Sequence, residues 1–198
     1  MSSASKKTRI VIIGAGAVGS TTAYTLLLRE RMDELVLIDV NKEKAFGDAL
    51  DMNHGLPFLG KARIWAGSFE DCAEADIIII TAGVSQRPGE SRIDLLKRNV
   101  AIYEGITDEV LKHNSNGILL IASNPVDIMS YFTWKNLAGL FIVSSGQALC
   151  LTVPAFVISS AINSELIPAV FTDILLVNMV IRNFHYGVLP ILPDQKFY

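Results

Sequence analysis

A glycine-rich turn near the amino terminus has residue types and spacing that could hold a phosphate group. Gly14, Gly16 and Gly19 follow an apolar run, 9–13, and precede a stretch, 20–31, that we expect to be helical. Gly14 permits a tight turn, Gly16 leaves room for a pyrophosphate beside the backbone, and Gly19 allows the helix to pack closely on the strand. The free N–H groups and the positive end of the helix dipole would then face the phosphates of a dinucleotide.

An acidic residue completes this pattern at the end of a second apolar run. Asp39 directly follows the run 35–38 and lies twenty residues after Gly19. Its carboxylate can accept hydrogen bonds from both ribose hydroxyls, and its charge would repel a 2′-phosphate. Since the next residues, Val40 and Asn41, offer no arginine to such a phosphate, the sequence predicts NAD rather than NADP. The alternative is a glycine turn and a strand-end aspartate with purely structural roles.

Two further stretches carry side chains suited to binding or catalysis. The loop 83–92 is rich in Gly and Pro and ends on Arg92, whose planar fork suits a carbonyl or carboxylate. Such a loop can close over a ligand and exclude water. In the stretch 123–127, the amide of Asn124 can bond a carboxamide or a hydroxyl, and Pro125 could follow a cis peptide bond. Alternatively, Arg92 is a solvated residue in a first helical turn, and Asn124 belongs to an ordinary Asn-Pro turn before a helix.

The elements that must position these residues alternate between strand and helix. Apolar runs predict five strands, and the clearest helix is 92–112, with apolar residues at helical spacing. The expected strands are 10–13, 35–38, 62–65, 76–81 and 118–122. This alternation predicts an α/β fold with a doubly wound parallel sheet, a Rossmann NAD-binding domain over residues 1–139. Ligands bind beyond the carboxyl ends of such strands, where the glycine turn, Asp39 and the two later stretches should meet.

Composition narrows the possible classes of protein. The 198 residues carry a net charge of −3, and no basic cluster follows Lys6 and Lys7, so nucleic-acid binding is disfavoured. Two cysteines indicate a reducing compartment without a disulfide framework, and the short polar stretch 1–8 does not resemble a signal peptide. We therefore expect a cytoplasmic protein, and we predict no metal site.

Taken together, these motifs resemble those of bacterial L-lactate dehydrogenases, in the lactate/malate dehydrogenase family. The resemblance runs from about residue 8 to 139. It is carried by 14–19, 37–39, 47–52, 83–95 and 123–127. It implies an oxidoreductase of glycolysis and fermentation that transfers a hydride between NADH and pyruvate, or NAD and (S)-lactate. Members of the family are commonly homotetramers.

The resemblance also implies roles for individual residues. Gln86 would select the short apolar side of pyruvate, whereas malate dehydrogenases usually carry Arg at this position. Arg92 would polarise the reacting carbonyl, and Asn124 would approach the substrate. Contacts to NAD are implied, besides the glycines and Asp39, for Val18, Lys44, Phe69, Gly83, Val84, Ala122, Ser123 and Asn124.

The family's catalytic histidine is not found in this chain. In relatives it lies in a G-E-H-G-D-x-E motif, and a second arginine that binds the substrate carboxylate lies in L-D-S-x-R; neither motif is present. We expect His54 to be structural and in a loop, and His113 to end a helix, where its charge suits the dipole. His185 has no acidic partner nearby in the sequence. We therefore predict no catalytic role for any of the three.

Residues 140–198 form a hydrophobic tail that departs from the family pattern. If the last base of each codon is read with the first two of the next, permitted codons from Leu176 to Phe184 spell G-E-H-G-D-T-E-L. The stretches 143–149 and 150–158 likewise yield V-I-G-S-G-T and then L-D-S followed by R-F-R-Y. Codon degeneracy leaves a choice at many positions, but the family motifs emerge in the right order and in one frame. Our hypothesis is a frameshift near Leu140, with the last strand, the substrate domain and activity lost.

Three competing interpretations of the chain remain open. The stretch 137–164 contains no charged residue, so the first is a membrane-anchored NAD-binding module. Gly139, Gly146, Gln147 and Pro154 within it argue against a span, so we expect no membrane association. The second is a non-catalytic NAD-sensing protein with an oligomerising tail. The third is a malate dehydrogenase, which Gln86 disfavours.

Overall fold

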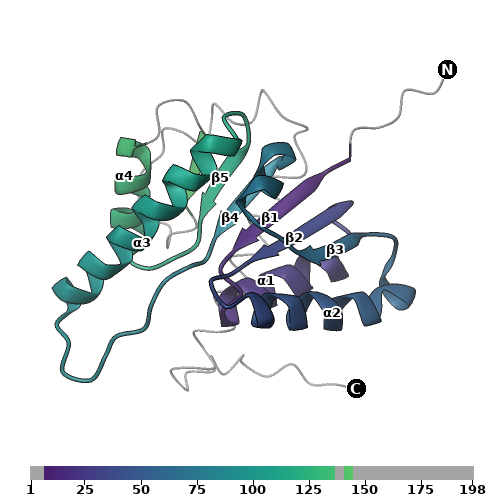
Figure 1. Ribbon diagram of the computed structural model, residues 1–198, viewed down its shortest axis with the longest axis horizontal. Coiled ribbons are helices and arrows are strands. Elements are labelled where there is room, and N and C mark those ends of the chain that lie inside the picture. The colour runs from purple at the N-terminus through teal and green to yellow at the C-terminus, as the bar shows by residue number, and fades with distance from the viewer. Residues whose placement is uncertain (1–6, 137–140, 145–198) are drawn as a thin grey trace, which may run out of the picture.

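A computed structural model describes residues 7–136 and 141–144 as a parallel β-sheet with helices on both faces (Figure 1). The described strands form one six-stranded sheet in the order β3-β2-β1-β4-β5-β6. The strands are β1 (Arg9–Ile13), β2 (Glu34–Ile38), β3 (Arg63–Ala66), β4 (Ile77–Ile80), β5 (Ile118–Ile121) and β6 (Phe141–Ser144). The helices are α1 (Ala17–Leu28), α2 (Lys42–Leu59), the 3-10 helix η1 (Phe69–Glu74), α3 (Arg92–His113) and α4 (Val126–Asn136). The predicted doubly wound parallel sheet is thus confirmed.

Alternate residues of the central strand β1 pack into two separate apolar cores, one on each face of the sheet. Ile10 and Ile12 of β1 pack with residues of α1 and α2, whereas Val11 and Ile13 pack with residues of α3 and α4. These four side chains are at most 3% exposed. Burying one such side chain contributes roughly 1.5–3 kcal/mol, so a strand that is apolar along its whole length is stable only between two helical layers.

Helix α1 begins and ends three residues earlier than the sequence pattern predicted. It starts at Ala17 because the turn is complete at Gly16, whose carbonyl already accepts the N–H of Ser20 at 2.9 Å. It ends at Leu28 because Glu30 adopts a left-handed backbone with φ of 49°. The N–H groups of Glu30 and Arg31 then close back onto the last turn, as in a Schellman motif.

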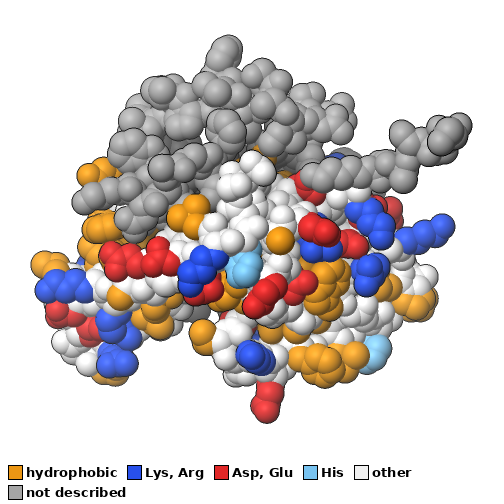
Figure 2. Space-filling model, turned by 45° about the horizontal axis from the view of Figure 1, so that its top comes forward, with side chains coloured by type: hydrophobic (Ala, Val, Ile, Leu, Met, Phe, Trp, Pro, Cys, Tyr) orange, Lys and Arg blue, Asp and Glu red, His pale blue; other side chains and the backbone are white. Residues whose placement is uncertain are grey.

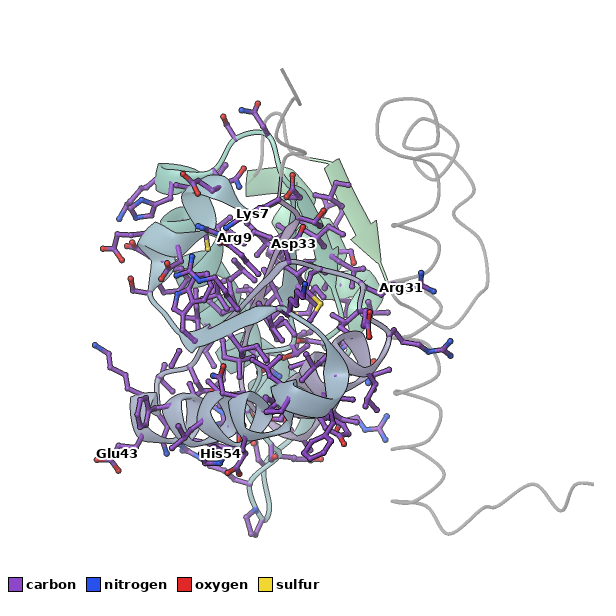
Figure 3. The ribbon with its side chains drawn as sticks, turned by 90° about the vertical axis from the view of Figure 1, so that its right-hand side faces the viewer. Lys7, Arg9, Arg31, Asp33, Glu43 and His54 are labelled. Carbon is purple, nitrogen blue, oxygen red and sulfur yellow. The ribbon has the colours of Figure 1, made fainter. Side chains whose placement is uncertain are left out.

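His54 lies in helix α2, so its predicted place in a loop was wrong. Helix α2 continues through Gly55 and includes Pro57 before it stops at Leu59. The partly buried side chain of Asn53 supports this stretch, since its amide donates to the carbonyls of Ala49 and Ile64, both at 2.8 Å. Figure 3 shows His54 on α2, together with Glu43, well away from Arg9 on β1.

The expectation that the sheet lacks its last strand was also wrong. Residues Phe141–Ser144 form β6, which pairs in parallel with β5 in the register Ile118↔Phe141 to Ile121↔Ser144. A strand at this position needs only backbone hydrogen bonds and residues of high β propensity, which Phe141, Ile142 and Val143 supply. The rest of the predicted aberrant tail, 140–198, lies outside the described residues.

Large apolar side chains are exposed on several helices and loops. Val40, Phe46, Phe58, Ile93 and Tyr131 are each at least 58% exposed. In the view of Figure 2 such side chains are interspersed with basic and acidic ones. Among the described residues, no helix combines the length and the apolar character needed to cross a bilayer.

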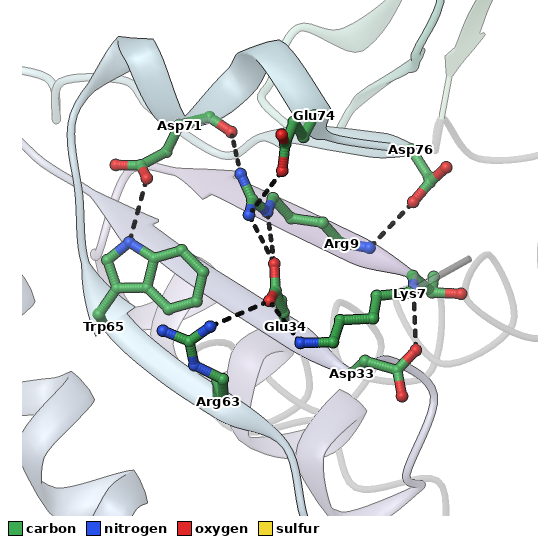
Figure 4. A network of polar contacts seen from close by, with 10 residues as sticks. Lys7, Arg9, Asp33, Glu34, Arg63, Trp65, Asp71, Glu74 and Asp76 are labelled. Carbon is green, nitrogen blue, oxygen red and sulfur yellow. Dashed lines mark hydrogen bonds and ion pairs between the residues drawn. The ribbon is translucent and has the colours of Figure 1, made fainter. Parts of the chain in front are cut away.

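A buried glutamate gathers cations at the amino-terminal edge of the sheet (Figure 4). Glu34, the first residue of β2, is 5% exposed and accepts hydrogen bonds from Nε and Nη2 of Arg9 at 2.8 and 2.6 Å. Lys7 and Arg63 approach its other oxygen at 3.5 and 3.4 Å. Both arginines also lie over the ring of Trp65, at 5.4 and 5.5 Å. The network therefore joins the first residues of three adjacent strands.

We expect Glu34→Gln to destabilise the fold by about 2–3 kcal/mol, because it leaves Arg9 without its buried anionic partner. The hydrogen bond from Arg9 holds the pKa of Glu34 below its ordinary value of 4.5. The stabilisation is thus complete above that ordinary value and is lost as the pH falls through the lowered pKa. Urea denaturation followed by circular dichroism measures both effects.

Glu74→Gln is the matched control for this substitution. Glu74 contacts the same arginine at 3.1 Å, but its side chain is 78% exposed, so its loss should cost less than about 0.5 kcal/mol. Equal losses in the two variants would show that burial of Glu34 does not matter.

Candidate nucleotide-binding site

Three predicted site residues, together with Thr81, directly follow four neighbouring strands at their carboxyl ends. Gly14 follows β1, Asp39 follows β2, Thr81 follows β4 and Ala122 follows β5. All these strands are parallel, so the four positions lie along one edge of the sheet. Hydrogen bonds join them across the strands: the N–H of Gly14 donates to Ile38, and the hydroxyl of Thr81 donates to the carbonyl of Gly14, both at 2.7 Å.

The three glycines of the turn meet three different constraints. Gly14 has a φ of 107°, and a Cβ there would come within 2.6 Å of the backbone nitrogen of Ala82. A Cβ on Gly19 would overlap the carbonyl oxygen of Gly14, so α1 packs directly on the turn. A Cβ on Gly16 would meet no atom within 4 Å. Of these three glycines, only Gly16 has no neighbouring atom that would exclude a side chain. The open space beside it suits the approach of a ligand.

The amino terminus of α1 is also suited to an anion. Gly16 is the N-cap, and no side chain caps the helix there. The first turn of α1, which includes Val18, contains no acidic residue. The backbone N–H groups at this end therefore face a position where phosphate oxygens would be stabilised. The residues present fit the pyrophosphate of a dinucleotide.

Asp39 lies at the predicted ribose position, and its carboxylate also accepts hydrogen bonds that stabilise the turn. Its Oδ2 accepts the N–H of Ala15 at 2.6 Å, and its Oδ1 accepts the N–H of Asn41 at 2.8 Å. A carboxylate has about four acceptor sites, so two remain for ribose hydroxyls. The side chain is only partly buried. The structure thus gives Asp39 a local role that the sequence pattern did not reveal, and leaves room for the predicted one.

Lys44 belongs to a polar cluster between α1 and α2. Its Nζ lies 2.7 Å from Oδ2 of Asp48 and 3.4 Å from the hydroxyl of Ser20. Ser20 and Asp48 also line a cavity of about 340 Å³, together with Thr21, Tyr24, Asp51 and Met52. Sequence reasoning identified Lys44 but missed Asp48 and Ser20. The spacing of four between Lys44 and Asp48 was the available signal, since such residues are neighbours on a helix.

The start of the loop after β4 is held by two buried side chains from other elements. The amide oxygen of Asn99, on α3, accepts the N–H of Val84 at 2.9 Å, and Asn99 is 4% exposed. The hydroxyl of Ser123, after β5, donates to the carbonyl of Ala82 at 2.6 Å. Gly83 lies between these two anchors. Asn99 was not predicted, although a polar residue on the apolar face of 92–112 could have indicated it.

The remainder of this loop is organised by one ion pair. Both carboxylate oxygens of Glu90 accept hydrogen bonds from Arg98 on α3, at 2.7 and 2.8 Å. Arg98 also donates to the carbonyl of Ser85 at 3.1 Å. The amide of Gln86 donates to the carbonyl of Glu90 at 2.6 Å, which folds the loop back on itself. Two hydrogen bonds lower the pKa of Glu90: the backbone N–H of Arg87 has the larger effect and the Arg98 side chain the smaller.

The remaining predicted residues lie around the same edge. Arg92 is exposed in the first turn of α3, which Ser91 caps by accepting the N–H of Asp94 at 3.2 Å. Asn124 is exposed and precedes Pro125 by a cis peptide bond, so the predicted cis turn is confirmed. Phe69 begins η1 and is partly buried.

The structure brings no described histidine into this group. His54 is exposed on α2, and His113 ends α3, as predicted. His185 lies outside the described residues. Within the described part of the chain, no three His, Cys, Asp or Glu side chains are grouped to hold a metal ion.

Comparisons with known proteins match the part of the chain that carries this site. Residues 8–140 match the model of the lactate/malate dehydrogenase NAD-binding domain. The L-lactate dehydrogenase of Acetivibrio thermocellus is 51% identical over 127 residues, which are 64% of this chain and 40% of that protein. The chain thus spans about two fifths of the length of this curated relative.

Solved structures give the same result. The ligand-bound minor L-lactate dehydrogenase of Enterococcus mundtii superposes with a TM-score of 0.69 at 42% identity, over 71% of this chain and 46% of that one. The apo malate dehydrogenase of Picrophilus torridus superposes with a TM-score of 0.65 at 31% identity, over 70% and 45% of the two chains.

Proposed function

The chain belongs to the lactate/malate dehydrogenase family, and from this premise we propose that it is the nucleotide-binding part of an L-lactate dehydrogenase. The observation that carries the proposal is the turn at Gly16, which faces open space at an uncapped helix end beside Asp39. The family's domain over this region binds NAD, and the bound cofactor would supply or accept the hydride.

Different residues at the carboxyl edge of the sheet would bind different parts of the cofactor and the substrate. Gly14, Gly16 and Gly19 form the turn for the pyrophosphate, and Asp39 accepts hydrogen bonds from the ribose. The loop after β4 carries the two residues proposed to meet the substrate. Gln86 favours a substrate without a second carboxylate, and Arg92 stabilises negative charge that develops on the carbonyl oxygen. The loop can close over both ligands and exclude water.

We propose further that the chain as written does not turn over substrate. Hydride transfer to pyruvate requires a proton donor for the carbonyl oxygen. The motifs that hold the family's histidine for this step and the arginine that anchors the carboxylate are not found in the sequence. Under the frameshift hypothesis, both residues would be encoded in the shifted frame after about Leu140. Nucleotide binding and catalysis would therefore be separated in this chain.

A titration of the full chain with NADH tests the proposed nucleotide site. We expect saturable binding, with enhanced NADH fluorescence. The affinity should be weaker than in a complete enzyme, since the frameshift hypothesis removes the substrate domain that would cover the cofactor. Asp39→Ala should weaken binding by about tenfold, since it removes charge-assisted hydrogen bonds to the ribose. Binding that is unaffected by Asp39→Ala would contradict the proposed site.

A further inference from the structure

A closed ring of contacts surrounds the glycine-rich turn. Asp39 accepts the N–H groups of Ala15 and Asn41, and the side chain of Asn41 accepts the N–H of Lys44 at 3.1 Å. Ser20 then completes the ring, because its hydroxyl lies 3.1 Å from the carbonyl oxygen of Ala15 and 2.5 Å from Oδ2 of Asp48. The same Asp48 oxygen meets the Lys44 ammonium at 2.7 Å. The ring therefore contains one lysine and two carboxylates with different partners.

The position of Lys44 gives this ring a consequence for nucleotide choice. Helix α2 starts at Lys42, three residues after Asp39, so Lys44 lies in the helical turn next to the predicted ribose carboxylate. An ammonium group there, at the positive end of a helix, would attract a 2′-phosphate. Lys44 is 44% exposed at its side chain and thus accessible to a ligand.

Asp48 holds this ammonium group in an ion pair. The Asp48 side chain is 25% exposed, and it receives both Lys44 and Ser20 on one oxygen. Partial burial acts to raise the pKa of Asp48, but the hydrogen bonds from Lys44 and Ser20 outweigh it and keep the pKa below its ordinary value. Asp48 therefore stays charged and compensates Lys44 at neutral pH.

We propose that Asp48 is a specificity-determining residue that disfavours NADP by neutralising and holding Lys44. Asp39 repels a 2′-phosphate directly, and Asp48 withholds the neighbouring cation that would otherwise attract it. This inference rests on the proposed nucleotide-binding function and assigns a second carboxylate to its cofactor preference.

The test compares the affinities of the full chain for NADH and NADPH. In Asp48→Asn, the dissociation constant for NADPH divided by that for NADH should fall by about three- to fivefold. This is the size expected for releasing a partly exposed ion pair. The shift should vanish in high salt, which screens the phosphate from Lys44. Adding Lys44→Gln to Asp48→Asn should return the ratio to that of the parent chain.

Asp51→Asn is the matched control. Asp51 is exposed on the same helix and lines the same cavity, so its substitution removes the same charge without freeing Lys44. Should Asp48→Asn fail to fold by circular dichroism, Asp48→Ser removes the charge and keeps a hydroxyl for Ser20.

The outcomes separate this inference from the proposed function. An equal shift in Asp51→Asn, no shift in Asp48→Asn, or a shift that persists without Lys44 would overturn the inference while the proposed function stands. A parent chain that binds neither nucleotide would overturn both.

Discussion

A chain whose reading frame is restored near codon 140 is expected to reduce pyruvate with NADH, whereas the chain as written gives no measurable turnover. The expected difference in kcat/KM is at least about 10⁴-fold. Loss of a general acid alone costs about 10²- to 10⁴-fold, and loss of the carboxylate anchor removes the orientation of the substrate as well. The measurement is the initial rate of NADH consumption by each purified protein over a range of pyruvate concentrations, which gives kcat/KM.

Two controls make this comparison specific. Replacing the restored histidine, which the hypothesis places across codons 178 and 179, with asparagine should lower kcat/KM by about 10²- to 10⁴-fold, because the general acid is lost while the carboxylate anchor remains. Oxaloacetate should be a poorer substrate than pyruvate for the restored chain, because Gln86 offers no charge to a second carboxylate. Normal turnover by the chain as written would contradict the frameshift proposal, and a preference for oxaloacetate would favour malate dehydrogenase activity instead.

Gly19→Ala is expected to destabilise the fold by about 3 kcal/mol or more, whereas Gly16→Ala should change stability by less than about 1 kcal/mol. A methyl group at Gly19 would overlap the carbonyl of Gly14 and crowd the hydroxyl of Thr81, so the turn and α1 would have to separate. At Gly16 the same group enters open space. The backbone there, with φ of −74° and ψ of −173°, is one that alanine adopts without strain.

For NADH binding by the folded protein, we expect the reverse: Gly16→Ala should weaken binding more than Gly19→Ala does. Gly16→Ala places a methyl group where the pyrophosphate is proposed to approach, so NADH affinity should fall at least about tenfold in a stable protein. Urea denaturation and NADH titration of each variant measure the two properties separately. A Gly16→Ala chain that binds NADH as the parent does would show that the nucleotide lies elsewhere.

Much of the fold could be predicted because its signals are local. Continuous apolar runs indicate strands covered on both faces, and the spacing of Gly14, Gly16 and Gly19 indicates a turn between strand and helix. Errors arose where a local pattern is ambiguous. The start of α1 is set by where the turn ends, and His54 follows an asparagine whose amide donates to β3 and to its own helix.

Neighbouring positions of the sequence predict the parallel sheet, the edge of the sheet that carries the candidate site and the residues along that edge, because hydrophobic period, glycine spacing and strand ends are local features. How those residues are held depends on contacts between elements, which form only in the folded chain. Asn99 anchors Val84, Arg98 pairs with Glu90, and Ser20 meets Asp48, each across elements or turns that a linear pattern does not relate. Such pairs form because the packing of helices on the sheet brings distant side chains within hydrogen-bond distance, and a buried polar group must then find a partner there.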